Sequence, residues 1–107
     1  MKAYKGFNHD WTCRGHKYEV GKTYKTNKPL KLCESGFHAC EKAADCFRYY
    51  PSVQWNRWAE VELAGTMLKA TDDSKVCASE ITIVKELSFD ELLDVIATQG
   101  GDKTSDG

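Results

Sequence analysis

Two segments in the second half of the chain carry the pattern of β-strands, and they limit the possible folds more than any other feature. Over residues 57–63, Ala59, Val61 and Leu63 alternate with a tryptophan and two glutamates. Residues 75–84 contain the β-rich run ITIV. Strict alternation is typical of a strand with one buried and one exposed face, and β-branched residues favour strands. We therefore expect a sheet that covers the core with one face.

Shorter patterns add further elements to the expected fold. Alternation over residues 2–7 predicts a first strand, and residues 17–20 and 23–26 predict a hairpin. Apolar residues then recur at three- and four-residue spacing, which predicts an amphipathic helix over residues 40–50 that Pro51 stops. The first half of the chain is thus expected to add small antiparallel strands and one short helix.

A second short helix is expected after the last strand. Ser88 and Glu91 match a capping box, in which each side chain accepts a hydrogen bond from a free backbone N–H at the helix start. The glycine pair at 100–101 caps this helix, and residues 101–107 contain no apolar side chain and are expected to form a disordered tail. The prediction is a single α+β domain over residues 1–100, a small antiparallel sheet with two short helices.

Composition and charge exclude some classes of function. A chain of 107 residues with 41% hydrophobic content is the size of one domain. Its 15 basic and 16 acidic residues give a formal charge of −1, so no overall field draws the protein to nucleic acid, and we expect no direct nucleic-acid binding. No segment is apolar enough to be a signal peptide or a membrane span. We expect a monomeric protein of the cytoplasm, without membrane contact.

The five cysteines indicate a metal site rather than disulfides. Structural disulfides are rare in the cytoplasm, and an odd number leaves one thiol over. The segment CESGFHAC places two cysteines and one histidine within eight residues, with Gly36 permitting a tight bend. If residues 37–40 are extended, the histidine and the second cysteine point to the same side. We predict a structural zinc site that staples the fold with four ligands drawn from Cys13, Cys33, His38, Cys40 and Cys77.

Each of these residues also has a simpler interpretation. A free cysteine is usually a small buried hydrophobe, and this interpretation is favoured for Cys46. A histidine such as His38 can be a core residue bonded to a backbone carbonyl. Cys13 and His16, three residues apart, remain a weaker alternative ligand pair. Nothing in the sequence singles out one thiol as a nucleophile, so no catalytic residue is assigned.

Two further groups of side chains have two interpretations each. The aromatic residues around Pro51 suit a partner-binding surface, because tryptophan and tyrosine dominate interface hot spots, but they suit the core of a small domain equally well. Glu60 and Glu62 lie on one side of a predicted strand, where they are able to bind a ribose or to act in acid–base chemistry. Their favoured role is that of a solvent-facing strand side. The candidate partner-binding residues are Tyr49, Tyr50, Trp55 and Trp58.

A set of short segments, in this order along the chain, resembles an uncharacterised family of small phage and prophage proteins. The similarity spans roughly residues 2 to 87, and the combination of segments is more specific than any one of them. The segments are Tyr4–Phe7 (YKGF), Thr12–Gly15 (TCRG), Tyr18–Gly21 (YEVG), Cys33–Cys40 (CESGFHAC) and Ser74–Cys77 (SKVC).

The resemblance implies a phage origin, and small phage proteins often inhibit host defence by stoichiometric binding. From size and this resemblance we expect a zinc-binding anti-CRISPR protein that binds a host RNA-guided nuclease. The near-neutral charge argues against DNA mimicry. Covering a protein domain, and so blocking the loading of target DNA, is the expected mode of inhibition.

An enzyme is the alternative. The order YKG, then SGFHA, then the Glu60–Glu62 pair is distantly similar to ADP-ribosyltransferases, which bind NAD. Lys5 stands where that family has an arginine, the serine-threonine-serine core is missing, and the glutamate pair comes early in the chain. Loss of activity in Glu62→Ala would be the mark of such an enzyme, and an inhibitor would tolerate the change.

Overall fold

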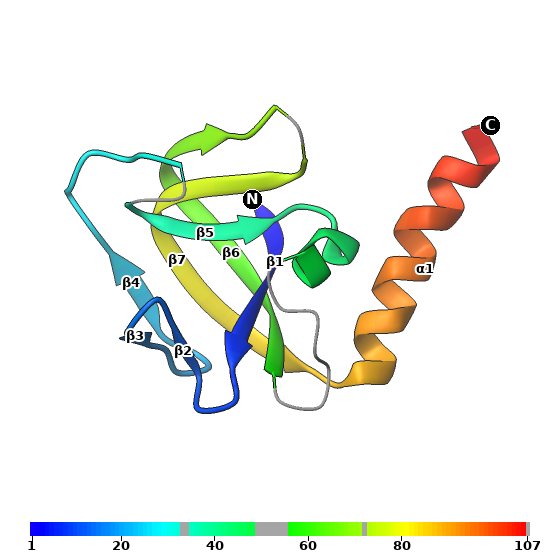
Figure 1. Ribbon diagram of the computed structural model, residues 1–107, viewed down its shortest axis with the longest axis horizontal. Coiled ribbons are helices and arrows are strands. Elements are labelled where there is room, and N and C mark those ends of the chain that lie inside the picture. The colour runs from blue at the N-terminus through cyan, green and yellow to red at the C-terminus, as the bar shows by residue number, and fades with distance from the viewer. Residues whose placement is uncertain (33–34, 49–55, 72, 107) are drawn as a thin grey trace.

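The computed structural model describes residues 1–32, 35–48, 56–71 and 73–106, the side chains of residues 48 and 100–106 aside. It contains seven strands, one 3-10 helix and one α-helix within these residues (Figure 1). The elements, in chain order, are β1 (Lys2–Asn8), β2 (Thr12–Cys13), β3 (His16–Lys17), β4 (Thr23–Lys25), β5 (Phe37–Cys40), η1 (Ala43–Arg48), β6 (Asn56–Lys69), β7 (Lys75–Leu87) and α1 (Phe89–Asp106).

The main sheet is antiparallel and closes on itself. Its strand order is β4-β7-β5-β1-β6, and β6 pairs with β7 as well, so that β1, β6, β7 and β5 form a ring. The β6–β7 hairpin forms its frame, with register shifts between Glu60 and Val61 and between Ala64 and Met67. Such shifts bend the strands and increase their twist, which a small closed sheet requires. Figure 1 shows the long hairpin curving around β1 and β5.

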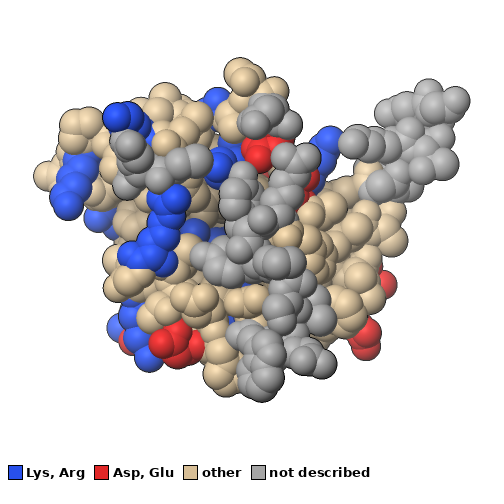
Figure 2. All heavy atoms as spheres, viewed as in Figure 1, with Lys and Arg blue, Asp and Glu red and all other residues tan. Residues whose placement is uncertain are grey.

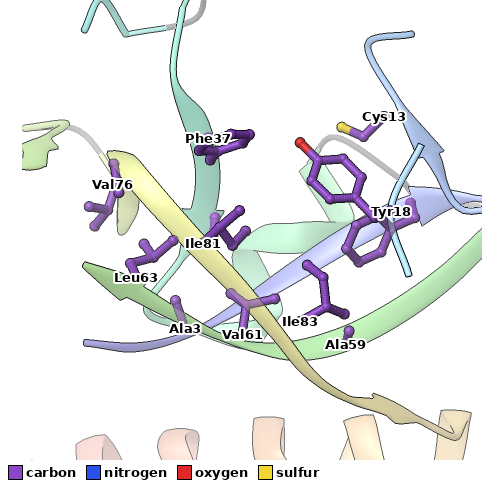
Figure 3. Close-up of a cluster of buried hydrophobic side chains, with 13 residues drawn as sticks. Ala3, Cys13, Tyr18, Phe37, Ala59, Val61, Leu63, Val76, Ile81 and Ile83 are labelled. Atoms are coloured by element: carbon purple, nitrogen blue, oxygen red, sulfur yellow. The ribbon is translucent and has the colours of Figure 1, made fainter. Parts of the chain in front are cut away.

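The first core cluster lies inside this ring (Figure 3). Ala59, Val61 and Leu63 of β6 are fully buried, as the alternation of residues 57–63 predicted. β7 adds Ile81 and Ile83 of the ITIV run, which are also fully buried. The two strand segments that the sequence marked most clearly therefore supply much of the interior, and the predicted antiparallel α+β class is confirmed.

A second core cluster lies on the opposite face of the sheet, beneath η1 and α1. Tyr4 and Trp58 of the sheet pack here with Leu92 of α1, which is fully buried. Gln99 of α1 joins the two helices: its Oε1 accepts a 2.9 Å hydrogen bond from the backbone N–H of Ala43, and its Nε2 donates a 2.9 Å bond to the carbonyl of residue 41. The helices thus cover the outer face of the sheet at one end.

The prediction of two short helices was wrong. The segment expected to form the first α-helix forms only η1, a 3-10 helix over Ala43–Arg48. Cys40 and the three residues before it form β5, which pairs with β7 and buries Phe37 and Ala39 in the core. Sheet pairing and burial outweigh a helical period of barely three turns, because a short helix has little stability of its own.

The predicted hairpin of residues 17–20 and 23–26 was also wrong. β3 pairs instead with β2, with Cys13 opposite His16, and β4 pairs with β7, with Tyr24 opposite Ile81. Both strands are only two or three residues long. The partner of so short a strand is decided by the nearest free sheet edge, which local sequence does not reveal.

The helix α1 begins at the predicted capping box. The backbone N–H of Ser88 donates to Glu91 Oε1 at 2.9 Å, and the N–H of Glu91 donates to Ser88 Oγ at 3.1 Å. The helix continues to Asp106, past the glycine pair where the sequence predicted its end. Glycine lowers helix stability by about 1 kcal/mol without forbidding the conformation. The disorder expected for residues 101–107 stays a prediction.

Removal of the Ser88 hydroxyl tests how firmly α1 is anchored. Ser88→Ala is expected to lower the free energy of unfolding by about 1 kcal/mol, because the first turn loses the acceptor for one backbone N–H. Urea denaturation followed by circular dichroism measures the change. Ser88→Thr, which keeps a hydroxyl, is the matched control and should cost less; equal losses in both variants would contradict the capping role.

Candidate anion-binding cleft

A cleft opens where β1 and β5 separate. The register given for these two strands is the single pair Tyr4–Cys40, whereas β5 stays paired with β7 from Phe37 to Cys40. Gly6 of β1 and His38 of β5 instead line a cavity of about 280 Å³. A second cavity of about 350 Å³ shares His38 and three further lining residues with the first. The split in the sheet therefore creates two adjoining cavities, which we call cavity 1 and cavity 2.

Four residues line both cavities, and we call them the shared wall: Lys5, Cys13, Arg14 and His38. They come from β1, from the β2–β3 hairpin and from β5. β1 and the β2–β3 hairpin follow each other along the chain, but β5 begins only at Phe37, and the closed sheet brings it beside them. The shared wall is the centre of the candidate site.

Lys5 is the most unusual member of the shared wall. It lies on β1 between Ala3 and Phe7, which belong to the interior cluster, and it is only 6% exposed. Its Nζ donates a 2.5 Å hydrogen bond to the carbonyl of His38. The same Nζ lies 5.8 Å from the ring centroids of both Phe7 and Tyr18. Among the residues that the structure describes, no carboxylate forms an ion pair with it, and burying a cation in this way is costly.

Further cations surround the shared wall. Lys75 lines cavity 1, and Lys25 and Lys28 line cavity 2; within the described residues, neither lining contains an aspartate or a glutamate. Lys25 also pairs with Glu80 at 3.7 Å, at an exposed position. Figure 2 shows Lys and Arg side chains gathered on the side of the molecule that carries β2–β4. In a chain of net charge −1, this is a local concentration of positive charge.

Arg14 occupies a position that ordinarily favours another residue type. It forms, with Gly15, the two-residue turn of the β2–β3 hairpin, and the two residues have φ angles of 53° and 79°. A hairpin turn with two positive φ angles favours asparagine or glycine, because a larger side chain adds steric strain there. Residues with such strained backbone angles occur more often at functional sites than elsewhere. Its side chain lines both cavities, which gives a reason for arginine at this position.

The pKa of His38 reflects the positive charges around the cleft. Burial, together with the neighbouring charges of Lys5, Arg14 and Lys75, lowers the pKa of its imidazole from 6.5 to about 4. At neutral pH the ring is therefore uncharged. Charging the ring would place another cation among those already in the cleft.

This pKa predicts how stability depends on pH. Because the folded-state pKa lies below the ordinary value of 6.5, the unfolded chain binds the proton first as pH falls, and stability should decrease between about pH 6.5 and pH 4. Below pH 4 this contribution becomes constant. Urea midpoints measured across this range should fall less steeply in His38→Gln than in the wild type. Parallel curves for the two proteins would contradict the assignment.

The predicted zinc ligands are only partly brought together. Cys13, His38 and Cys40 all line cavity 1, but Cys77 is fully buried on β7 and its thiol donates a 2.9 Å hydrogen bond to the carbonyl of Ser35. Cys33 lies outside the described residues. Within the described part of the chain, no group of three His, Cys, Asp or Glu residues is arranged to hold a metal ion. The structural zinc site stays a prediction, which elemental analysis of protein purified without chelator checks.

Two thiols in cavity 1 interact with each other. A hydrogen bond from the Cys46 thiol is the main cause that lowers the pKa of Cys40, and the same bond, followed by burial, raises the pKa of Cys46. Cys46 is 2% exposed and packs in the second core cluster, as expected for a small buried hydrophobe. The two thiols line one part of cavity 1, where their sulfur atoms form a polarizable and only weakly polar surface.

The aromatic residues proposed as a partner-binding surface are described only at Trp58. Its side chain is 3% exposed and packs against Phe47 in the second core cluster, so at this position the core interpretation holds. Its Nε1 has no hydrogen-bond partner among the described residues. Tyr49, Tyr50 and Trp55 lie outside the described residues.

The two glutamates of the enzyme alternative lie away from the cleft. Glu60 pairs with Lys2 at 3.6 Å, and Glu62 pairs with the amino group of Met1 at 3.1 Å. Neither residue lines cavity 1 or cavity 2. Their placement matches the side of a strand that faces solvent.

The sequence did not identify the cationic members of the site. Lys5, Arg14 and Lys75 belong to three different segments, so no local spacing joins them. Two weak signals were present: Lys5 interrupts the inward-facing positions of a period-two strand, and Arg14 precedes a glycine in a tight turn. A charged residue at an inward-facing position of a strand is the more useful of the two.

The fold and the cleft define a small closed antiparallel sheet, covered on one side by helices, with a basic cavity where two strands diverge. The chain belongs to the family described as a domain of unknown function (DUF7666), whose model matches residues 1–95. An uncharacterised family is what the sequence segments predicted. No curated protein and no solved structure matches the chain. Among the described residues no helix has the length and apolar character needed to cross a membrane.

Proposed function

We propose that this protein binds a small anionic ligand in the cleft between β1, β5 and the β2–β3 hairpin. The observation that carries the proposal is Lys5: a buried ammonium group at the shared wall whose described partners are a carbonyl oxygen and two ring faces. An anion at the shared wall would supply the negative charge that offsets the cost of burying this cation.

The neighbouring side chains support the same ligand chemistry. Arg14 offers a planar fork of N–H donors that matches phosphate or carboxylate, and Lys75 adds a third positive charge. Concave sites that bind small molecules have volumes of about 300–1,000 Å³; cavity 2, at about 350 Å³, lies at the lower end of this range, and cavity 1, at about 280 Å³, lies just below it. The proposal is one of binding and assigns no catalytic step.

The role in a host cell is a separate proposal. Stoichiometric inhibition of an RNA-guided nuclease stays a prediction from the sequence resemblance, and a basic cleft is compatible with it. The ADP-ribosyltransferase alternative gains no support from the placement of Glu60 and Glu62.

Calorimetric titration with inorganic pyrophosphate tests the proposed function, and Arg14→Asn is its sharpest variant. We expect one pyrophosphate per chain, bound more weakly as salt concentration rises. Arg14→Asn should weaken binding by about tenfold, the loss of one charge-assisted contact. The same variant should unfold at equal or higher urea concentration, because asparagine suits a positive φ better than arginine does.

Lys69→Gln is the matched control. Lys69 is exposed on β6, pairs with Glu41 at 3.4 Å and lines neither cavity. Its replacement removes one positive charge from the protein and should leave pyrophosphate binding unchanged. No saturable binding to the wild type, or an equal loss in Arg14→Asn and Lys69→Gln, would refute the proposed function. If an oligonucleotide binds more tightly than pyrophosphate, the ligand of the cleft is nucleic acid and not a small anion.

A further inference from the structure

The two cavities differ in chemical character, and this difference narrows the class of ligand. Cavity 1 extends from the shared wall into apolar and weakly polar surroundings. Cavity 2 extends from the same wall past the rings of His16, Tyr18 and Phe37 towards polar and cationic groups. Beyond the shared wall, the described lining of cavity 1 has no such cation apart from Lys75. The following inference rests on the proposed function and deepens it by naming the two parts of the ligand.

Cavity 1 suits a flat, uncharged group. Apart from the shared wall and Lys75, it is lined by Tyr4, Gly6, Ala39, Cys40 and Cys46. Tyr4, Ala39, Cys40 and Cys46 are each no more than 6% exposed, so they belong to the packed interior and form firm walls. Small side chains at Gly6 and Ala39 leave the gap between the two strands open. A phosphate alone would leave this apolar compartment unfilled.

Cavity 2 suits a second charged group. Lys28, which forms no ion pair with a described carboxylate, lies there with Lys25, Thr26 and Ser35. The backbone N–H of Lys28 is itself bound to Thr26 Oγ1 at 3.2 Å, which holds this loop in place beside β4. A ligand with two linked anionic groups would therefore contact cations both at the shared wall and in cavity 2.

We propose that the ligand is a nucleoside diphosphate, with the base in cavity 1 and the diphosphate extending from the shared wall into cavity 2. A nucleobase is planar and largely apolar, and its face packs well against aromatic and small apolar side chains. Lys5 and Arg14 stand at the junction, where the sugar-linked phosphate meets the base compartment. The terminal phosphate then meets Lys28.

Calorimetry with three probes tests this proposal: ADP, inorganic pyrophosphate and adenosine, all without divalent metal. ADP should bind about tenfold or more tightly than pyrophosphate, because the base fills cavity 1. Adenosine should bind more weakly than ADP by a larger factor, because it lacks the charged groups. ADP that binds no more tightly than pyrophosphate would overturn the nucleotide and leave the proposed function standing. Failure of both ADP and pyrophosphate to bind would overturn both.

A variant that fills cavity 1 separates the two parts of the ligand. Cys46→Leu places a larger side chain in this cavity and should remove the advantage of ADP over pyrophosphate. Cys40→Leu, on β5, is a second variant with the same expected result, should Cys46→Leu on η1 fail to fold. Cys77→Ala is the matched control, because Cys77 is also a buried cysteine but lines neither cavity. An undiminished preference for ADP in a folded cavity-filling variant would place the base elsewhere and refute the assignment.

Discussion

Replacement of Lys5 by methionine is expected to weaken pyrophosphate binding at least about tenfold while leaving the protein as stable as before, or more stable. The loss of affinity follows from removing a buried ammonium at the shared wall, since a hydrogen bond to a charged group contributes about 1.5–3 kcal/mol. The gain in stability has a separate cause. Methionine is similar in length, packs between the rings of Phe7 and Tyr18, and carries no charge that must be desolvated.

The balance of stability in this variant is the sum of two effects. The carbonyl of His38 loses its hydrogen bond from Nζ, which costs about 1–3 kcal/mol if no water replaces it. Replacing buried charged groups by apolar side chains of similar volume is often neutral or stabilises by about 1–4 kcal/mol, and Lys5 has no ion pair with a described carboxylate. We therefore expect the urea midpoint to stay the same or to rise. An ordinary structural lysine would show the reverse, a loss of stability without an effect on ligand.

Lys2→Met is the matched control for this experiment. Lys2 lies on the same strand, but its side chain is 60% exposed and pairs with Glu60 at 3.6 Å. Both variants remove one positive charge, so a general effect of net charge would appear in both. Equal affinities in Lys5→Met and the wild type would show that the buried ammonium does not contact the ligand.

Gly36→Ala is expected to destabilise the protein by about 3 kcal/mol. Gly36 has a φ of 92°, and a methyl group there would lie 2.5 Å from Cys77 Sγ and 2.7 Å from Leu30 Cδ2. A positive φ costs an L-residue about 1–2 kcal/mol, and forcing an extra methyl group into a packed core costs about 1–3 kcal/mol more. Urea denaturation measures the sum. The shape of the cavities should also change, since Gly36 precedes β5 and lines cavity 2.

Two further variants divide this effect into its parts. Gly21 has a φ of 89° with no atom within 4 Å of the added methyl group, so Gly21→Ala measures the backbone cost alone and should lose about 1 kcal/mol. Cys77→Ala combined with Gly36→Ala removes the closest clash and should recover part of the loss. Equal losses for Gly36→Ala and Gly21→Ala would show that the contact with Cys77 carries no cost.

The features that the sequence predicted correctly are local ones. The alternation of Ala59, Val61 and Leu63 marks a buried strand face because successive side chains of any strand point to opposite sides. The capping box at Ser88 is equally local, because its two hydrogen bonds join residues three positions apart. The alternation of a strand is local too, so once Phe37–Cys40 is extended, His38 and Cys40 point to the same side, as the sequence predicted for that case, and both line cavity 1.

The predictions that failed involved a choice between partners. Residues 17–20 and 23–26 have strand-like composition, but β4 found its partner in β7, more than fifty residues away. The segment after Cys40 has a helical period, but it forms only a 3-10 helix, in which Ala43 and Cys46 pack into the second core cluster. Propensity is a weak preference, and tertiary contacts override it in short segments.

The sequence by itself determined the antiparallel class, the two long strands, the start of α1 and an uncharacterised family, because each depends on short-range pattern or on matched segments. Only the tertiary structure decided the cleft. Lys75 is far from Lys5 and Arg14 along the chain, and the three gain a common role only because the sheet closes on itself and then separates between Tyr4 and Gly6. Burial of a charge and the gathering of like charges are properties of three-dimensional proximity, and a linear pattern does not contain them.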